Sequence, residues 1–147
     1  MATFIGYPTG KILAVFDTPD AADRAIEALG GIGARVGGTD IQRFSGTADA
    51  DRFDASGVRH GIVARALRVM QFGLMDQLPA MAWYEAALRE GRIVLTVVSG
   101  DRATTLRRVD ALRSAGGHFI NRFGRLSTEE FARWSGPEPH VPNLMKH

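Results

Sequence analysis

The sequence predicts a single α+β domain in which two strand–helix–strand units flank a helical insertion. Residues 11–16 and 92–98 are short, almost continuously apolar runs, as expected of strands that are buried on both faces. Each run is followed by a helix start signal, a helix that ends at paired glycines, and a further strand, at 39–44 and at 118–123. Two units of the same order and similar length indicate a repeated βαβ plan.

The first unit covers residues 11–46. Asp17 and Thr18 are both candidates for the N-cap of the helix predicted at 18–29, and Pro19 suits its first turn. Alanine and leucine then recur at helical spacing until a pair of glycines ends the helix. The second strand of this unit mixes polar and apolar residues, as an edge strand does.

The second unit covers residues 92–126, with its helix at 101–115 and its last strand at 118–123. Alternation along that last strand predicts two distinct faces. One face carries Phe119, Asn121 and Phe123, and the other carries His118, Ile120 and Arg122. The preceding Gly116-Gly117 pair permits the close approach of a ligand or of backbone.

Together the two units predict a ferredoxin-like fold with a four-stranded antiparallel sheet, whose two apolar strands are central. The unit helices would cover one face of this sheet. Residues 58–90 predict a helical hairpin, with a second helix at about 80–90 after Pro79, that covers the other face in its own chain or in a neighbour. Residues 45–57 read as a surface loop, while 1–10 and 135–147 read as extended arms.

Composition excludes several classes of protein. The chain of 147 residues has no cysteine, so disulfides and thiolate sites are excluded. It has no apolar run long enough for a membrane span and no signal-peptide pattern at its start, which predicts a cytoplasmic location. The formal net charge is only +2, so composition alone gives no reason to expect nucleic-acid binding.

Two histidines are the first candidates for a binding site. Histidine is the side chain whose ordinary pKa lies nearest to neutral pH, which makes His60 and His118 candidates. If adjacent, they could hold an anion or a metal, although no third metal ligand is evident. The simpler interpretation is that each is satisfied by local hydrogen bonds. We therefore predict no metal and no cofactor.

Aromatic and basic residues supply the other candidates. Trp83 and Tyr84 could line a pocket for a planar ligand, although such a pair is more often core or subunit interface. Arg65 and Arg68 belong to a basic stretch that could grip phosphate, although a solvated helix face is the commoner role of such a stretch. Neither pattern identifies a reaction.

Short stretches of the chain resemble small bacterial domains described as general stress or heat-induced stress proteins. The stretches that carry the likeness are Val15-Phe16-Asp17-Thr18, the run from Tyr84 to Gly91 that leads into strand 93–98, and Gly116-Gly117-His118-Phe119. The resemblance implies a stress-associated role. It implies no catalytic residue.

The leading hypothesis is a non-catalytic binding or assembly module, either homo-oligomeric or docked in a larger protein complex. Exposed edge strands favour pairing with another chain. The arms would wrap a neighbour through the apolar anchors Phe4, Tyr7, Val141 and Leu144. Alternatives are a small cofactor-free enzyme or ligand-binding protein, and a protein that associates with RNA or the ribosome.

Overall fold

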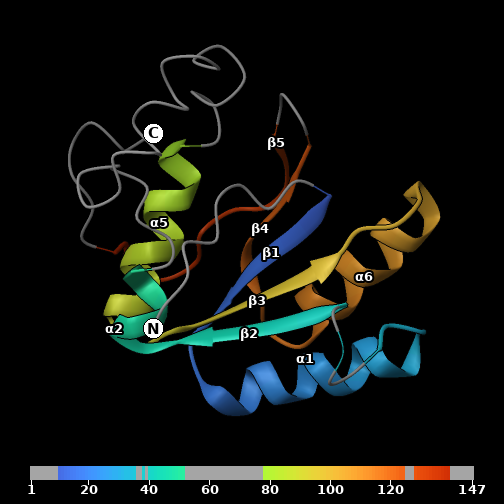
Figure 1. Ribbon diagram of the computed structural model, residues 1–147, viewed down its shortest axis with the longest axis horizontal. Helices are drawn as coiled ribbons and strands as arrows, with labels where there is room; N and C mark the ends of the chain where they lie inside the picture. The colour runs from blue at the N-terminus through green and yellow to red at the C-terminus, as the bar shows by residue number, and fades with distance from the viewer. Residues whose placement is uncertain (1–9, 36–37, 39, 52–77, 125–127, 140–147) are drawn as a thin grey trace.

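A five-stranded antiparallel sheet with helices on both faces forms the α+β fold of this protein (Figure 1). The computed structural model describes residues 10–35, 38, 40–51, 78–124 and 128–139. The strands are β1 (Lys11–Phe16), β2 (Ile41–Ser45), β3 (Ile93–Val98), β4 (His118–Phe123) and β5 (Thr128–Ala132). The helices are α1 (Pro19–Gly31), α2 (Gly46–Asp51), α5 (Leu78–Arg89) and α6 (Arg102–Ser114). The strands lie in the order β2-β3-β1-β4-β5.

Two apolar layers lie on opposite faces of the sheet, because side chains alternate along each strand. In β1, Ile12, Ala14 and Phe16 join the layer under α1 and α6, whereas Leu13 and Val15 join the layer under α5. Figure 1 shows α1 and α6 on one side of the sheet and α2 and α5 on the other. The prediction that the two unit helices share one face is confirmed, and α5 covers the other face from within the same chain.

Three local predictions need correction. The predicted loop at 45–57 contains α2, whose Asp49 carboxylate accepts a hydrogen bond from the Ser45 N–H at 2.8 Å and whose Ala50 is buried beside α5. Pro79 does not precede α5 but lies in its first turn, where a missing N–H costs no helical hydrogen bond. The fifth strand, β5, was not predicted, and it extends the sheet beyond β4.

A β-bulge interrupts β4 where it pairs with β1. Leu13 lies opposite Asn121 and Val15 opposite His118, so β4 carries one extra residue between these pairs. Phe119 takes a φ of +47°, which is uncommon for a residue with a side chain. The alternation predicted for β4 therefore holds for Phe119, Phe123 and Ile120, but the bulge re-aims His118.

Several predicted features lie outside the described residues. These are the arm at 1–10 except Gly10, the first helix of the hairpin, and the tail from residue 140 onward. Within the segments that are described, no helix is both long and apolar enough to cross a membrane.

Candidate functional site

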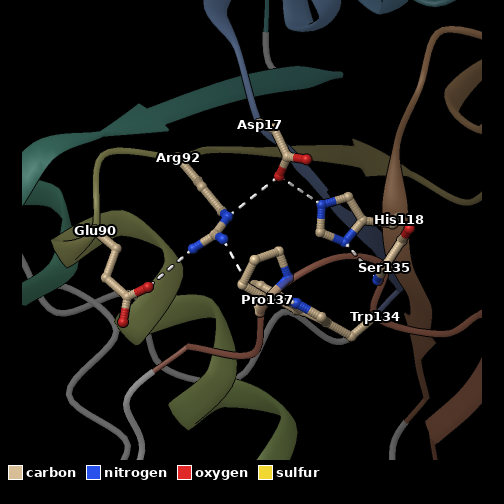
Figure 2. Close-up of polar contacts among 7 residues, drawn as sticks. All are labelled: Asp17, Glu90, Arg92, His118, Trp134, Ser135 and Pro137. Carbon is tan, nitrogen blue, oxygen red and sulfur yellow. Dashed lines mark hydrogen bonds and ion pairs between the residues drawn. The ribbon is translucent and has the colours of Figure 1, made fainter.

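Polar and aromatic side chains from four segments meet where β1 ends and where β3 and β4 begin (Figure 2). Asp17 directly follows β1, Arg92 directly precedes β3, and His118 is the first residue of β4. The fourth segment is residues 134–139, which follow β5 and which we call the strap. The cluster brings His118, a predicted ligand-binding residue, together with charged neighbours.

Asp17 is free to join the cluster because its neighbour caps the helix. Thr18 Oγ1 accepts a hydrogen bond from the Ala21 N–H at 3.2 Å and is the N-cap of α1. One carboxylate oxygen of Asp17, Oδ1, lies 2.8 Å from His118 Nε2 and 3.2 Å from Arg92 Nε. Burial alone would raise the pKa of Asp17, but the hydrogen bonds and charges of His118 and Arg92 outweigh it and hold that pKa below its usual range.

The lowered pKa predicts how an Asp17→Asn variant responds to acid. A carboxyl with a depressed folded-state pKa adds stability above its unfolded pKa and loses it as the pH falls through the folded value. Because this side chain is 59% exposed, we expect the variant to be less stable at pH 7 by no more than about 1 kcal/mol. Urea unfolding should show this difference at pH 7, and the difference should shrink as the pH falls below the ordinary pKa of an aspartate. A difference that does not shrink in acid would contradict the assignment.

Both ring nitrogens of His118 are engaged. Nδ1 accepts a hydrogen bond from the backbone N–H of Ser135 at 3.2 Å, so the ring hydrogen of the neutral imidazole must lie on Nε2. That hydrogen is donated to Asp17 Oδ1. The His118 side chain is only 6% exposed. His118 was predicted as a ligand-binding residue, and the structure places it as a bridge between the end of β1 and the strap.

Arg92 connects the remaining parts of the cluster. Besides its bond to Asp17, its Nη1 donates to Glu90 Oε1 at 2.9 Å and its Nη2 donates to the Pro137 carbonyl at 3.2 Å. Its guanidinium also lies 5.1 Å from the centre of the Trp134 ring. From the sequence, Arg92 was expected only to begin a strand. Its pairing with Asp17 was available from the β1–β3 register, in which Phe16 lies opposite Ile93.

An aromatic cluster lies directly beside these polar groups. Trp83 stacks on Phe119 at 5.4 Å between ring centroids, and Trp134 contacts Trp83 edge-on at the same distance. Tyr84 packs against Phe119 and Phe123. Trp83 and Tyr84, predicted to line a ligand pocket, are both buried in this cluster, so the structure places them in the core.

The Tyr84 hydroxyl is fully buried and joins three segments of the chain. It lies 2.7 Å from the Phe119 carbonyl oxygen and 3.1 Å from the Leu13 carbonyl oxygen, and it accepts a hydrogen bond from Asn121 Nδ2 at 2.9 Å. Burial raises the pKa of Tyr84 far above its ordinary range, and the hydrogen bond from Asn121 offsets this only in part. The hydroxyl therefore stays protonated and acts as a structural link between α5, β1 and β4.

The other predicted site residues lie outside the described parts of the chain. They are His60, Arg65 and Arg68 of the predicted ligand site and Phe4, Tyr7, Val141 and Leu144 of the predicted arms. Their assignments stay predictions. Among the residues that the structure does describe, no three His, Asp or Glu side chains are grouped so that they could hold a metal ion.

Comparisons with protein-family models, with curated proteins and with solved structures find no match for this chain. The resemblance to bacterial stress-associated domains stays a prediction.

Proposed function

We propose that this protein is a non-catalytic assembly module with a ferredoxin-like core, which associates with a second copy of itself through the outer edge of β2. The order β2-β3-β1-β4 and the helix that follows β1 and β3 support the ferredoxin-like assignment. β5 then extends that core on the β4 side, which leaves β2 as the opposite edge of the sheet.

The observation that carries the proposal is the direction of the β2 backbone groups. The Val98 N–H donates to the Asp40 carbonyl at 2.9 Å, so residue 40 forms a hydrogen-bonded pair with β3. In an antiparallel ladder such pairs alternate. The backbone N–H and C=O groups of residues 42 and 44 therefore also bond to β3, whereas those of residues 41, 43 and 45 point away from β3. The Ser45 N–H confirms this direction because it bonds to Asp49 and not to β3. No described strand lies beyond this row.

The opposite edge, β5, is less suited to pairing. Ile120 of β4 lies opposite Ala132 of β5, and Asn121 lies opposite Glu130, so one residue of β5 has no partner between these pairs. A bulge of this kind disfavours pairing with a further strand. Arg113 Nη2 also donates to the Phe131 carbonyl at 2.9 Å, which covers one backbone acceptor. β2 pairs with β3 in unbroken register over all five residues, so it offers the more regular template.

Charge at the centre of β2 is compatible with a two-fold pairing. An antiparallel β2–β2 contact centred on Arg43 places the two Arg43 side chains opposite one another, which alone would be destabilising. Each Arg43 guanidinium already forms an ion pair with Asp23 of α1. The pairing would therefore assemble an alternating set of two cations and two anions.

The groups most able to do chemistry support a non-catalytic role within the described residues. His118 uses both ring nitrogens in internal bonds, and the Tyr84 hydroxyl is buried among three partners. A general base needs a nitrogen or oxygen that can reach a substrate proton. Neither side chain offers one in this arrangement.

Replacing Arg43 with Pro tests the edge. Because the Arg43 N–H points outward, proline removes a donor from the outer row without removing a bond to β3. We expect the wild-type protein to be a dimer by native mass spectrometry and light scattering, and Arg43→Pro to be a monomer. Arg43→Ala is the matched control, since it also loses the ion pair with Asp23 but keeps the N–H, and it should remain dimeric.

Circular dichroism of both variants would show that the sheet is intact. A wild-type protein that stays monomeric at every concentration would overturn the proposal, and so would an Arg43→Pro variant that is as dimeric as Arg43→Ala.

A further inference from the structure

The strap, residues 134–139, is attached to the sheet by a small set of identifiable contacts. The Ser135 N–H bonds to His118 Nδ1, and the Pro137 carbonyl accepts from Arg92 Nη2 and from Trp134 Nε1. The Trp134 ring contacts the rings of Trp83 and Phe119. It also lies perpendicular to the His118 ring, at 4.8 Å between centroids, and Figure 2 shows these two side chains together. The bond to His118 is the one among these that depends on the charge state of a titratable group.

Only the neutral form of His118 can accept the Ser135 hydrogen bond. In imidazolium both nitrogens carry hydrogen and both are donors. A proton on Nδ1 would face the Ser135 N–H, so one hydrogen bond is replaced by the contact of two donors. The other nitrogen, Nε2, keeps its bond to Asp17 in either form, because it carries hydrogen in both. Protonation thus leaves the ring anchored on the sheet and opposes only the strap.

We propose that the strap is a pH-sensitive latch, closed while His118 is neutral and released when the ring takes up a second proton. Release would uncover the sides of Trp83 and Phe119 that Trp134 covers, and so expose an aromatic surface when His118 is protonated. This device involves the ends of β1, β3 and β4 and not the outer row of β2, so it does not depend on the proposed dimer.

The direction of the pH dependence of strap closure follows from the number of protons bound in the closed and open states. With the strap closed, Nδ1 is blocked by a donor. With the strap open, the ring lies beside the Asp17 carboxylate and can carry both protons. The open state therefore binds more protons, and closure is favoured as the pH rises. Among the described residues, Asp17 contacts the ring and favours the second proton. Arg92, which shares Asp17 Oδ1 and is itself paired with Glu90, opposes it.

Amide hydrogen exchange followed by NMR measures the latch directly. The Ser135 amide and the Trp134 indole N–H report the strap, and the Leu95 amide in central strand β3 serves as the internal reference. Protection factors, which correct for the intrinsic pH dependence of exchange, should be compared from about pH 8 to about pH 5, where imidazoles in proteins change charge. Because one proton is coupled, protection of Ser135 should fall by up to about tenfold per pH unit while Leu95 stays protected.

Two variants separate the two ring nitrogens. In His118→Asn the amide oxygen can replace Nδ1 as acceptor for Ser135, and in His118→Gln the amide group can replace Nε2 as donor to Asp17. We expect His118→Asn to keep the strap protected at every pH, and His118→Gln to leave it unprotected at every pH. Neither should retain the wild-type pH dependence.

The wild-type protein also gives a test that needs no variant. Nitrogen chemical shifts of the ring should show hydrogen on Nε2 at pH 8, and the midpoint of ring titration should coincide with the loss of Ser135 protection. Hydrogen found on Nδ1 at pH 8 would overturn the latch. The same conclusion follows if the ring titrates while Ser135 protection stays constant, or if His118→Asn loses protection with acid as the wild type does.

Discussion

Replacing Tyr84 with Phe is expected to lower the free energy of unfolding by about 2 to 3 kcal/mol, although the substitution removes a single oxygen atom. The hydroxyl is fully buried and serves the carbonyl oxygens of Phe119 and Leu13 and the side-chain amide of Asn121. Phenylalanine retains the ring contacts with Phe119 and Phe123. It leaves each of the three polar groups with one partner fewer in a fully buried site.

A double-mutant cycle with Asn121 would show that the loss belongs to the hydrogen bonds. Urea unfolding of Tyr84→Phe, Asn121→Ala and the double variant should give a coupling energy of at least about 0.5 kcal/mol, because the two side chains contact each other directly. A Tyr84→Phe variant within about 0.5 kcal/mol of wild type would mean that the hydroxyl does not link the layers as the structure indicates.

The parts of the fold that local sequence determines strongly were predictable. Continuous apolar runs marked β1 and β3 as central. A cap signal at Asp17 or Thr18, together with the glycines after the helix, predicted α1 to within two residues of its observed ends. β5 and α2 carry no such signal. β5 contains two adjacent glutamates and is held by pairing with β4 and by the ion pair between Arg102 and Glu129. These are tertiary contacts, and they override a weak local preference.

The contacts of the candidate site likewise differ in whether the sequence could predict them. Asp17 and Arg92 follow from the antiparallel register once β1 and β3 are known to be neighbours. The bond between His118 and Ser135 does not, because it depends on the bulge in β4 and on the shifted register of β5, which together decide where the strap lies. His118 could be singled out from the sequence for its chemistry. The partners of His118 depend on the bulge in β4 and on the register shift of β5, and no local sequence pattern predicts either one.

At Gly117 the structure decides between two alternatives that the sequence left open. From the sequence, the Gly116-Gly117 pair was expected to permit the close approach of a ligand or of backbone, and at Gly117 the structure shows backbone and a side chain of the same chain. A Cβ at residue 117 would lie 2.8 Å from the Leu112 carbonyl oxygen and 2.9 Å from Cζ of Phe16. The carbonyl belongs to α6 and already accepts the Gly117 N–H, and Phe16 is fully buried. Neither neighbour can move without displacing a packed element.

Gly117→Ala is therefore expected to cost about 2 to 3 kcal/mol of unfolding free energy, at the upper end of what overpacking a well-packed site usually costs. Gly31→Ala is the matched control, since a Cβ there meets no atom within 4 Å and Gly31 ends helix α1. That variant should be neutral or more stable by up to about 1 kcal/mol.

Both variants add one methyl group and remove one glycine from the unfolded chain, so the difference between them measures the collision with Leu112 and Phe16. Thermal unfolding followed by calorimetry would compare them under one set of conditions. Equal stability of the two variants would show that β4 and α6 can separate at this point, and would contradict the close contact of Gly117 with Leu112 and Phe16.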